Sequence, residues 1–191
     1  MMKNVILIDY ENVHVEKLNL LTGIDSEVWV FVGPSQSTVP VELLVSAQNS
    51  GVPLKWVETS RQGKNALDFH IAYYLGQMSW VESKPYFHIV SKDKGYEALI
   101  EHMRAQKLFV DRIASLEELP LLKKKNAEEI RNLLMATNAR PKKLKGLHAS
   151  IKNWRKAFSD ETVDWIANYL KQHGVISVDA NDNVSYSDAE A

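Results

Sequence analysis

The chain has 191 residues, of which 45% are hydrophobic and 25% are charged. This composition excludes a disordered or collagen-like chain and suffices for one domain with a core and a small second module. There is no cysteine, which excludes disulfides, zinc–thiolate sites and cysteine nucleophiles, so any metal ion must be held by oxygen or imidazole. No apolar run approaches the roughly 20 residues of a membrane span, and we expect a soluble, cytoplasmic protein.

The net charge of −1 conceals an uneven distribution of charge along the chain. Residues 1–122 carry 11 Lys or Arg against 15 Asp or Glu, residues 123–156 carry 11 against 2, and residues 157–191 carry 1 against 7. The middle segment is therefore strongly basic, as expected of a surface that meets phosphates.

Apolar runs of strand length alternate with segments of helical period over the first part of the chain. Strands are expected at residues 4–8, 28–32, 54–57, 87–90 and 108–113, and helices near 12–22, 39–49, 65–80 and 94–106. The strict alternation predicts an α/β fold with a doubly wound, mostly parallel sheet. Ligands of such sheets collect at the carboxyl ends of the strands, where the strand order reverses.

The pattern changes after residue 115, and Lys123–Lys125 is expected to begin a charged linker. Three helical faces follow, the third opened by Ser159 as a cap and ended at Gly174, and then a hairpin over residues 175–186. We therefore expect two domains, residues 1–122 and 123–191, the second a small winged-helix-like α+β module.

Two aspartates follow strands that a doubly wound sheet can make neighbours. Asp9 follows the first predicted strand and Asp93 the fourth, so their carboxylates converge if those strands are adjacent. Either aspartate alone is more simply explained as a helix cap. Asp68 adds weight to a shared site, because helical period puts it on the apolar stripe of its helix, where an unpaired charge is costly. A structural ion pair of Asp68 with Lys64, Lys92 or Lys94 remains the alternative.

Carboxylates with the amide of Asn12 would form an all-oxygen site, which suits Mg²⁺ or Mn²⁺ better than zinc. Such an ion activates water and stabilises charge on a phosphate. Phosphodiester hydrolysis is the chemistry that this donor set favours.

Three segments in order resemble the NYN branch of the PIN-like nucleases: Ile8–Val13, Lys64–Asp68 and Val90–Ile100. The resemblance covers about residues 3–115. It implies a metal-dependent ribonuclease, with Asp9, Asp68 and Asp93 as metal ligands and with Asn12 and Ser91 as further catalytic residues.

One position departs from the family pattern. The family commonly has a second acid two residues after the third-motif aspartate, where this chain has Gly95, with Lys92 and Lys94 on either side of Asp93. Glu97 or Glu11 could compensate. The open alternative is a non-catalytic RNA-binding or adaptor protein on the same fold.

The expected partner is single-stranded or structured RNA, with DNA possible through the C-terminal module. A winged-helix DNA-binding regulator is a further alternative, and a merely solvated basic face is the simplest explanation of the lysines. Trp29, Trp56 and Trp80 are expected in or near the core, and the six histidines show no ligand spacing. The candidate phosphate-binding residues are Arg61, Lys64, Lys92, Lys142, Lys143, Lys145, Lys152, Arg155 and Lys156.

Overall fold

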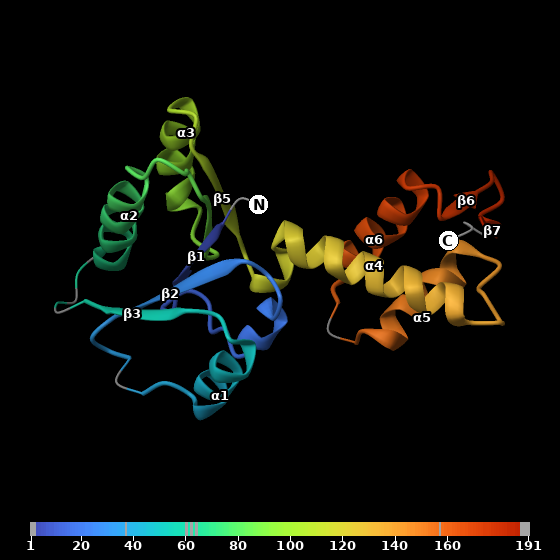
Figure 1. The fold of residues 1–191 in the computed structure, drawn as a ribbon, viewed down its shortest axis with the longest axis horizontal. Helices are drawn as coiled ribbons and strands as arrows, with labels where there is room; N and C mark the ends of the chain where they lie inside the picture. Colours follow the sequence, from blue (N-terminus) through green and yellow to red (C-terminus); the bar gives the residue numbers. More distant parts are fainter. Residues whose placement is uncertain are drawn as a thin grey trace. The chain divides into compact units, whose positions relative to one another are not determined.

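The structure is a computed structural model that describes residues 3–36, 38–59, 61, 63, 65–156 and 158–187. The chain divides into two compact units, Met1–Leu119 and Pro120–Ala191, drawn in Figure 1 in blue to yellow-green and in yellow to red. None of the described helices is long and apolar enough to cross a bilayer.

A five-stranded parallel sheet forms the centre of the first unit, in the order β3-β2-β1-β4-β5. The strand order reverses between β1 and β4, which pair from Asn4 with Tyr86 to Ile8 with Val90. The predicted alternation and the adjacency of the first and fourth strands are therefore confirmed. The strands are β1 Asn4–Asp9, β2 Ser26–Val32, β3 Leu54–Glu58, β4 Tyr86–Val90 and β5 Phe109–Ile113.

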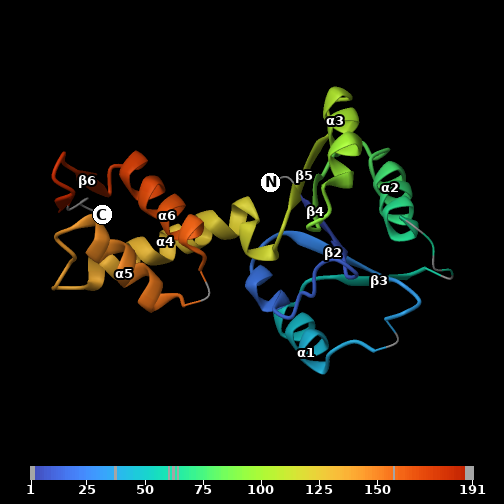
Figure 2. The same ribbon diagram turned by 180° about the vertical axis from the view of Figure 1, so that it is seen from behind.

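Helices cover both faces of this sheet, with α2 and α3 on one face and α1 on the other (Figures 1 and 2). The first of these layers is packed by one apolar cluster that joins Val5 and Leu7 of β1 to Ile71 of α2 and Ile100 of α3. The helical segments are η1 Leu18–Leu21, α1 Val41–Ser50, α2 Ala66–Met78, η2 Lys94–Tyr96, α3 Glu97–Ala105 and η3 Leu116–Glu118.

The alternation of side chains along β1 decides where its last residue points. Val5 and Leu7 face the α2 and α3 layer, and residues two apart on a strand share a face. Asp9 is the next residue of that series. A carboxylate thus continues an apolar column at the carboxyl end of the sheet, under the first turns of α2 and α3.

Two expectations for the first unit are wrong. The helix predicted over residues 12–22 is reduced to the short 3-10 turn Leu18–Leu21, because the chain after β1 turns back and the backbone N–H groups of Asn12 and Val13 donate to the carbonyl of Asp9. The second concerns the tryptophans expected in or near the core: Trp80, after the end of α2, is 91% exposed, and Trp56 on β3 is 38% exposed.

The second unit has three helices and a two-stranded antiparallel hairpin, with a core of its own. The expected linker at Lys123–Lys125 is wrong, because these lysines lie inside α4. The hydroxyl of Ser159 accepts the backbone N–H of Thr162 at 3.1 Å, and Gly174 has a left-handed φ of 68°, as expected for the two ends of the third helix. The elements are α4 Pro120–Ala136, α5 Leu144–Trp154, α6 Asp160–Gln172, β6 Ile176–Val178 and β7 Val184–Tyr186.

Candidate active site

Asp9 is fully buried at the carboxyl end of β1, and its carboxylate is surrounded by donors. Its Oδ2 accepts from the Asn12 amide at 2.8 Å and from the Ser91 hydroxyl at 2.9 Å. Its Oδ1 accepts the backbone N–H of Asn12 at 3.3 Å. A charged carboxylate is stable in the interior only with such partners, so Asn12 and Ser91 orient Asp9.

Asp68 lies in the first turn of α2, and its carboxylate meets that of Asp9 through a tyrosine. The Tyr96 hydroxyl donates to Asp68 Oδ1 at 2.8 Å and lies 3.3 Å from Asp9 Oδ2. Neither Lys92 nor Lys94 forms the alternative ion pair with Asp68, whose bonded side chain among the described residues is Tyr96. Lys64, the third partner considered, lies outside the described residues. Asp68 is partly buried, next to the face of α2 that packs on the sheet.

Asp93 is in the same neighbourhood but turns toward its own backbone. Its Oδ1 accepts the Gly95 N–H at 2.7 Å and so caps the short turn η2. A Cβ on Gly95 would stand 3.2 Å from that oxygen, so glycine leaves room for the cap. The Ser91 hydroxyl that holds Asp9 also accepts the backbone N–H of Asp93 at 3.1 Å, which ties the two aspartates to one serine.

The charges of these groups are coupled. Burial raises the pKa of the Asp68 carboxyl above its usual value, and the negative charges of Asp9 and Asp93 add to the rise, while the bond from Tyr96 opposes it. Burial, together with the carboxylates of Asp9 and Asp68, raises the pKa of the Tyr96 phenol, which stays protonated. The charges of Asp9 and Asp93 therefore lie close enough to Asp68 to affect its ionisation.

The arrangement of these carboxylates determines whether the site could bind a divalent cation. In the described part of the chain, no three or more Asp, Glu or His side chains are grouped as a metal site. However, Mg²⁺ is commonly held by one or two carboxylates, with water and substrate phosphate completing its shell. Two carboxylates that reach a common point, with a third close enough to raise a pKa, fit such an ion.

The two candidate compensating acids have other contacts. Glu97 is half-exposed and accepts from Arg112 Nε at 2.8 Å. Glu11 lies over Gly33, where a Cβ would stand only 1.7 Å from Glu11 Oε1. Neither acid replaces the one missing at Gly95.

A groove of about 430 Å³ opens beside α2, at the carboxyl ends of β2 and β3. The exposed Arg61 is its cation, and Gln36 is fixed in its wall by bonds to the backbone of Gly33 and Tyr10. Lys64 lies outside the described residues, and Lys92 is exposed next to the site. The groove is lined by Glu11, Pro34, Ser35, Gln36, Thr59, Arg61, Gly63 and Ala66.

Comparison with protein families matches residues 3–113 to the PIN domain. The chain belongs to the PIN domain family. The match spans the whole five-stranded sheet and every acidic residue of the site described above. No curated protein and no solved structure matches the chain. The assignment to the NYN branch stays a prediction.

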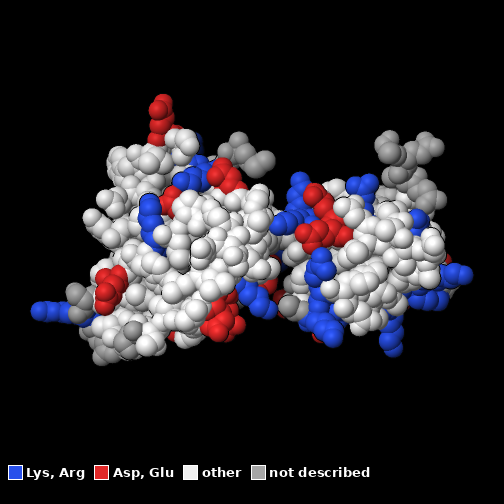
Figure 3. Space-filling model, turned by 60° about the horizontal axis from the view of Figure 1, so that its bottom comes forward, with Lys and Arg blue, Asp and Glu red and all other residues white. Residues whose placement is uncertain are grey.

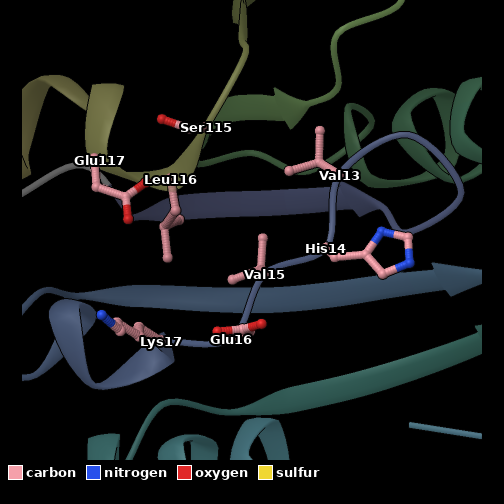
Figure 4. A pocket seen from close by; sticks show the side chains of 8 residues that line it. All are labelled: Val13, His14, Val15, Glu16, Lys17, Ser115, Leu116 and Glu117. Atoms are coloured by element: carbon pink, nitrogen blue, oxygen red, sulfur yellow. The ribbon is translucent and has the colours of Figure 1, made fainter. Parts of the chain in front are cut away.

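A second, smaller pocket of the PIN domain, of about 190 Å³, lies on the loops after β1 and β5. Figure 4 shows its lining, which comes from residues 13–17 and 115–117 and mixes apolar side chains with Glu16, Lys17 and Glu117. It contains none of the site aspartates. Its neighbour Tyr10 is stacked on His14, with ring centroids 4.9 Å apart.

Six of the nine basic residues expected to bind nucleic acid, all except Arg61, Lys64 and Lys92, lie outside the PIN domain match. Several of the six already have partners. Lys143 donates to the Asn181 carbonyl at 2.9 Å, Arg155 pairs with Glu129 at 2.8 Å, and Lys152 pairs with Asp160. Lys142, Lys145 and Lys156 are exposed. Figure 3 shows basic side chains surrounding an acidic group on this unit.

Sequence reasoning missed Tyr96, although it lies inside the third motif of the PIN domain. The available signal was its place three residues after Asp93, at the start of a helix that packs on the same face of the sheet as Asp68. Trp154, which lies among the basic residues at the end of α5, is partly buried against the core of the second unit.

Proposed function

We propose that this PIN domain is a metal-dependent ribonuclease that hydrolyses RNA phosphodiester bonds. The observation that carries the proposal is the convergence of the Asp9 and Asp68 carboxylates on one hydroxyl, at the reversal point of the sheet in a PIN fold. Such a crevice is where doubly wound sheets bind their ligands.

Asp9 and Asp68 would hold Mg²⁺ or Mn²⁺, and Asp93 would add its charge. When bound, such a cation activates water and offsets the charge that develops on the phosphate. The chain's own residues orient the ligands: Asn12 and Ser91 fix Asp9, and the backbone of Asp93 fixes Ser91.

Substrate binding next to the acids falls to the groove beside α2. Arg61 stands in it as a cation suited to one phosphate of the chain, and Lys92 and Lys94 flank Asp93 on the exposed side. These cations offset the repulsion between an RNA backbone and an acidic site. Single-stranded RNA is the proposed substrate, since an unpaired backbone can bend toward the acids beside the groove.

The C-terminal unit would help to bind the nucleic acid. Its order of elements, together with the isolated antiparallel bridge between Lys143 and Asn183, supports the proposal of a winged-helix-like module. In a module of this kind the helix before the hairpin reads duplex DNA. Here that helix, α6, begins with Asp160 and Glu161 and the hairpin turn carries Asp179, so the basic α4 and α5 side is the better phosphate surface.

The test is cleavage of a labelled single-stranded RNA with Mn²⁺ or Mg²⁺, with EDTA as the control. Asp68→Asn removes one charge but keeps an oxygen for the Tyr96 hydroxyl, and we expect cleavage to fall by about a hundredfold or more. Asp25→Asn is the matched control, an exposed aspartate of the same unit. Equal cleavage by Asp68→Asn and the wild type would refute the catalytic proposal.

A second candidate function is RNA binding without cleavage. It is favoured by the orientation of Asp93, whose carboxylate caps η2, and by the glycine at position 95. It predicts RNA affinity that is unchanged by EDTA and falls steeply with salt. Metal-dependent cleavage that is lost in Asp68→Asn excludes it.

A further inference from the structure

Tyr96 occupies a position that the proposed catalytic roles do not explain. Its ring is 3% exposed and belongs to the apolar cluster between the sheet and α3. Only its hydroxyl leaves that cluster, and the hydroxyl reaches both carboxylates of the site, Asp68 at 2.8 Å and Asp9 at 3.3 Å. A phenol carries one proton, so it can fully satisfy only one of the two carboxylates at a time.

The other contacts of the two aspartates show what this hydroxyl does. Asp9 is held independently of Tyr96, by Asn12 and Ser91. Asp68 has no other bonded side chain among the described residues, so the hydroxyl is the one link between the carboxylates.

We propose that the Tyr96 hydroxyl and a divalent cation compete for the carboxylates of Asp9 and Asp68, the hydroxyl joining the two in the cation-free protein. The inference rests on the proposed function in one respect: it takes Asp9 and Asp68 as the residues that meet the cation. It goes beyond that function in assigning Tyr96 as the residue that sets how tightly the site binds an ion.

The fixed ring makes this competition costly for the cation. Packing in the core holds the ring in place, and a phenol oxygen cannot move relative to its ring. A cation that binds the two oxygens facing the hydroxyl, Asp68 Oδ1 and Asp9 Oδ2, must therefore displace the hydroxyl before it gains its own contacts. Hydrogen bonds to charged groups are among the stronger ones in proteins, so the hydroxyl weakens cation binding appreciably.

Tyr96→Phe isolates this effect, because it keeps the ring and removes one oxygen. We expect Mn²⁺ to bind the variant about tenfold more tightly than the wild type, as the loss of one charge-assisted hydrogen bond implies. We also expect Mn²⁺ to raise the melting temperature of the variant more than that of the wild type. The cation-free variant should itself melt lower, because the two carboxylates lose their shared donor.

The experiment measures Mn²⁺ affinity by titration calorimetry, and melting with and without Mn²⁺, on the full chain. Tyr73→Phe is the matched control, since Tyr73 lies exposed on α2 and its hydroxyl bonds to no described residue. Asp68→Asn should abolish the binding in either background. Unchanged or weaker Mn²⁺ binding by Tyr96→Phe would overturn the inference, because a purely structural tyrosine or a tyrosine ligand gives that result.

Failure of the inference and failure of the ribonuclease proposal are separate results. Metal-dependent cleavage by the wild type, with Mn²⁺ affinity unchanged in Tyr96→Phe, refutes the competition and leaves the ribonuclease. No cleavage, with tighter Mn²⁺ binding by Tyr96→Phe that requires Asp68, supports the competition and refutes the ribonuclease. Absence of Mn²⁺ binding in both proteins overturns the inference.

Discussion

The charged groups of the two units differ in how firmly they are held. In the PIN domain, Asp9 is fully buried and has donors on both oxygens. In the C-terminal unit, Lys152 pairs with Asp160, whose side chain is 93% exposed. A buried charge must have fixed partners, whereas an exposed charge can be solvated and contributes mainly to the local field. The positions of individual charged atoms are thus informative about function in the first unit. In the second unit, the net charge of the surface is the more informative quantity.

The largest expected effect concerns a buried group of the sheet away from the aspartates. Burial lowers the pKa of His88 to about 4, with a small opposing effect of Asp111. His88 stays neutral in the fold while the unfolded chain takes up a proton near pH 6.5, so its contribution to stability is present above pH 6.5 and is lost as the pH falls toward 4. The loss is about 3 kcal/mol.

His88→Gln tests this, because glutamine can still bond to Asn4, the partner of His88 at 3.0 Å. Urea unfolding between pH 7 and 4 should give a shallower fall in the free energy of unfolding for the variant than for the wild type. His102→Gln, at an exposed position, should keep the wild-type slope. Parallel curves for His88→Gln and the wild type would contradict the assignment.

The next effect concerns the serine shared by two aspartates. Ser91→Ala removes a donor from Asp9 and the acceptor of the Asp93 N–H. Because both groups are then left short of a partner inside the fold, we expect the free energy of unfolding to fall by about 2 kcal/mol. Cleavage should fall as well. Ser91→Thr, which keeps the hydroxyl, should recover part of both losses, and no recovery would show that the hydroxyl is not what matters.

The sequence predicts those parts of the fold and of the site that leave a local pattern, and it misses those that depend on tertiary contacts. Continuous apolar runs predict all five strands, because strands buried on both faces leave that pattern. The helix expected over residues 12–22 is absent because the turn after β1 is fixed by the carbonyl of Asp9, a tertiary effect without a periodic signal. The positions of the aspartates follow from strand ends and helix stripes. The bridge made by Tyr96 depends on how α2 and α3 pack on the sheet. The local signal, its place three residues after Asp93, does not show which carboxylates the hydroxyl meets.

A smaller effect is expected at the basic surface. Lys142 and Lys145 are exposed and form no ion pair with a described residue. If they contact phosphates, replacing both by Gln should lower RNA affinity several-fold and reduce the slope of log affinity against log salt by about 1.4. Fluorescence anisotropy over a range of salt concentrations measures both. Lys171→Gln, on the acidic α6, is the control, and an unchanged slope in the double variant would mean a merely solvated face.

The smallest effect belongs to the pair of Lys152 and Asp160. The lysine bond lowers the pKa of the Asp160 carboxyl, yet that carboxylate is almost wholly in water, where screening and side-chain entropy offset the attraction. We therefore expect Lys152→Gln to leave the melting temperature unchanged at any salt concentration, while RNA affinity falls only if Lys152 leaves Asp160 to meet a phosphate. A clear drop in melting temperature would show that exposed pairs stabilise this unit. The two units would then no longer differ in whether their charged side chains have fixed partners or are solvated.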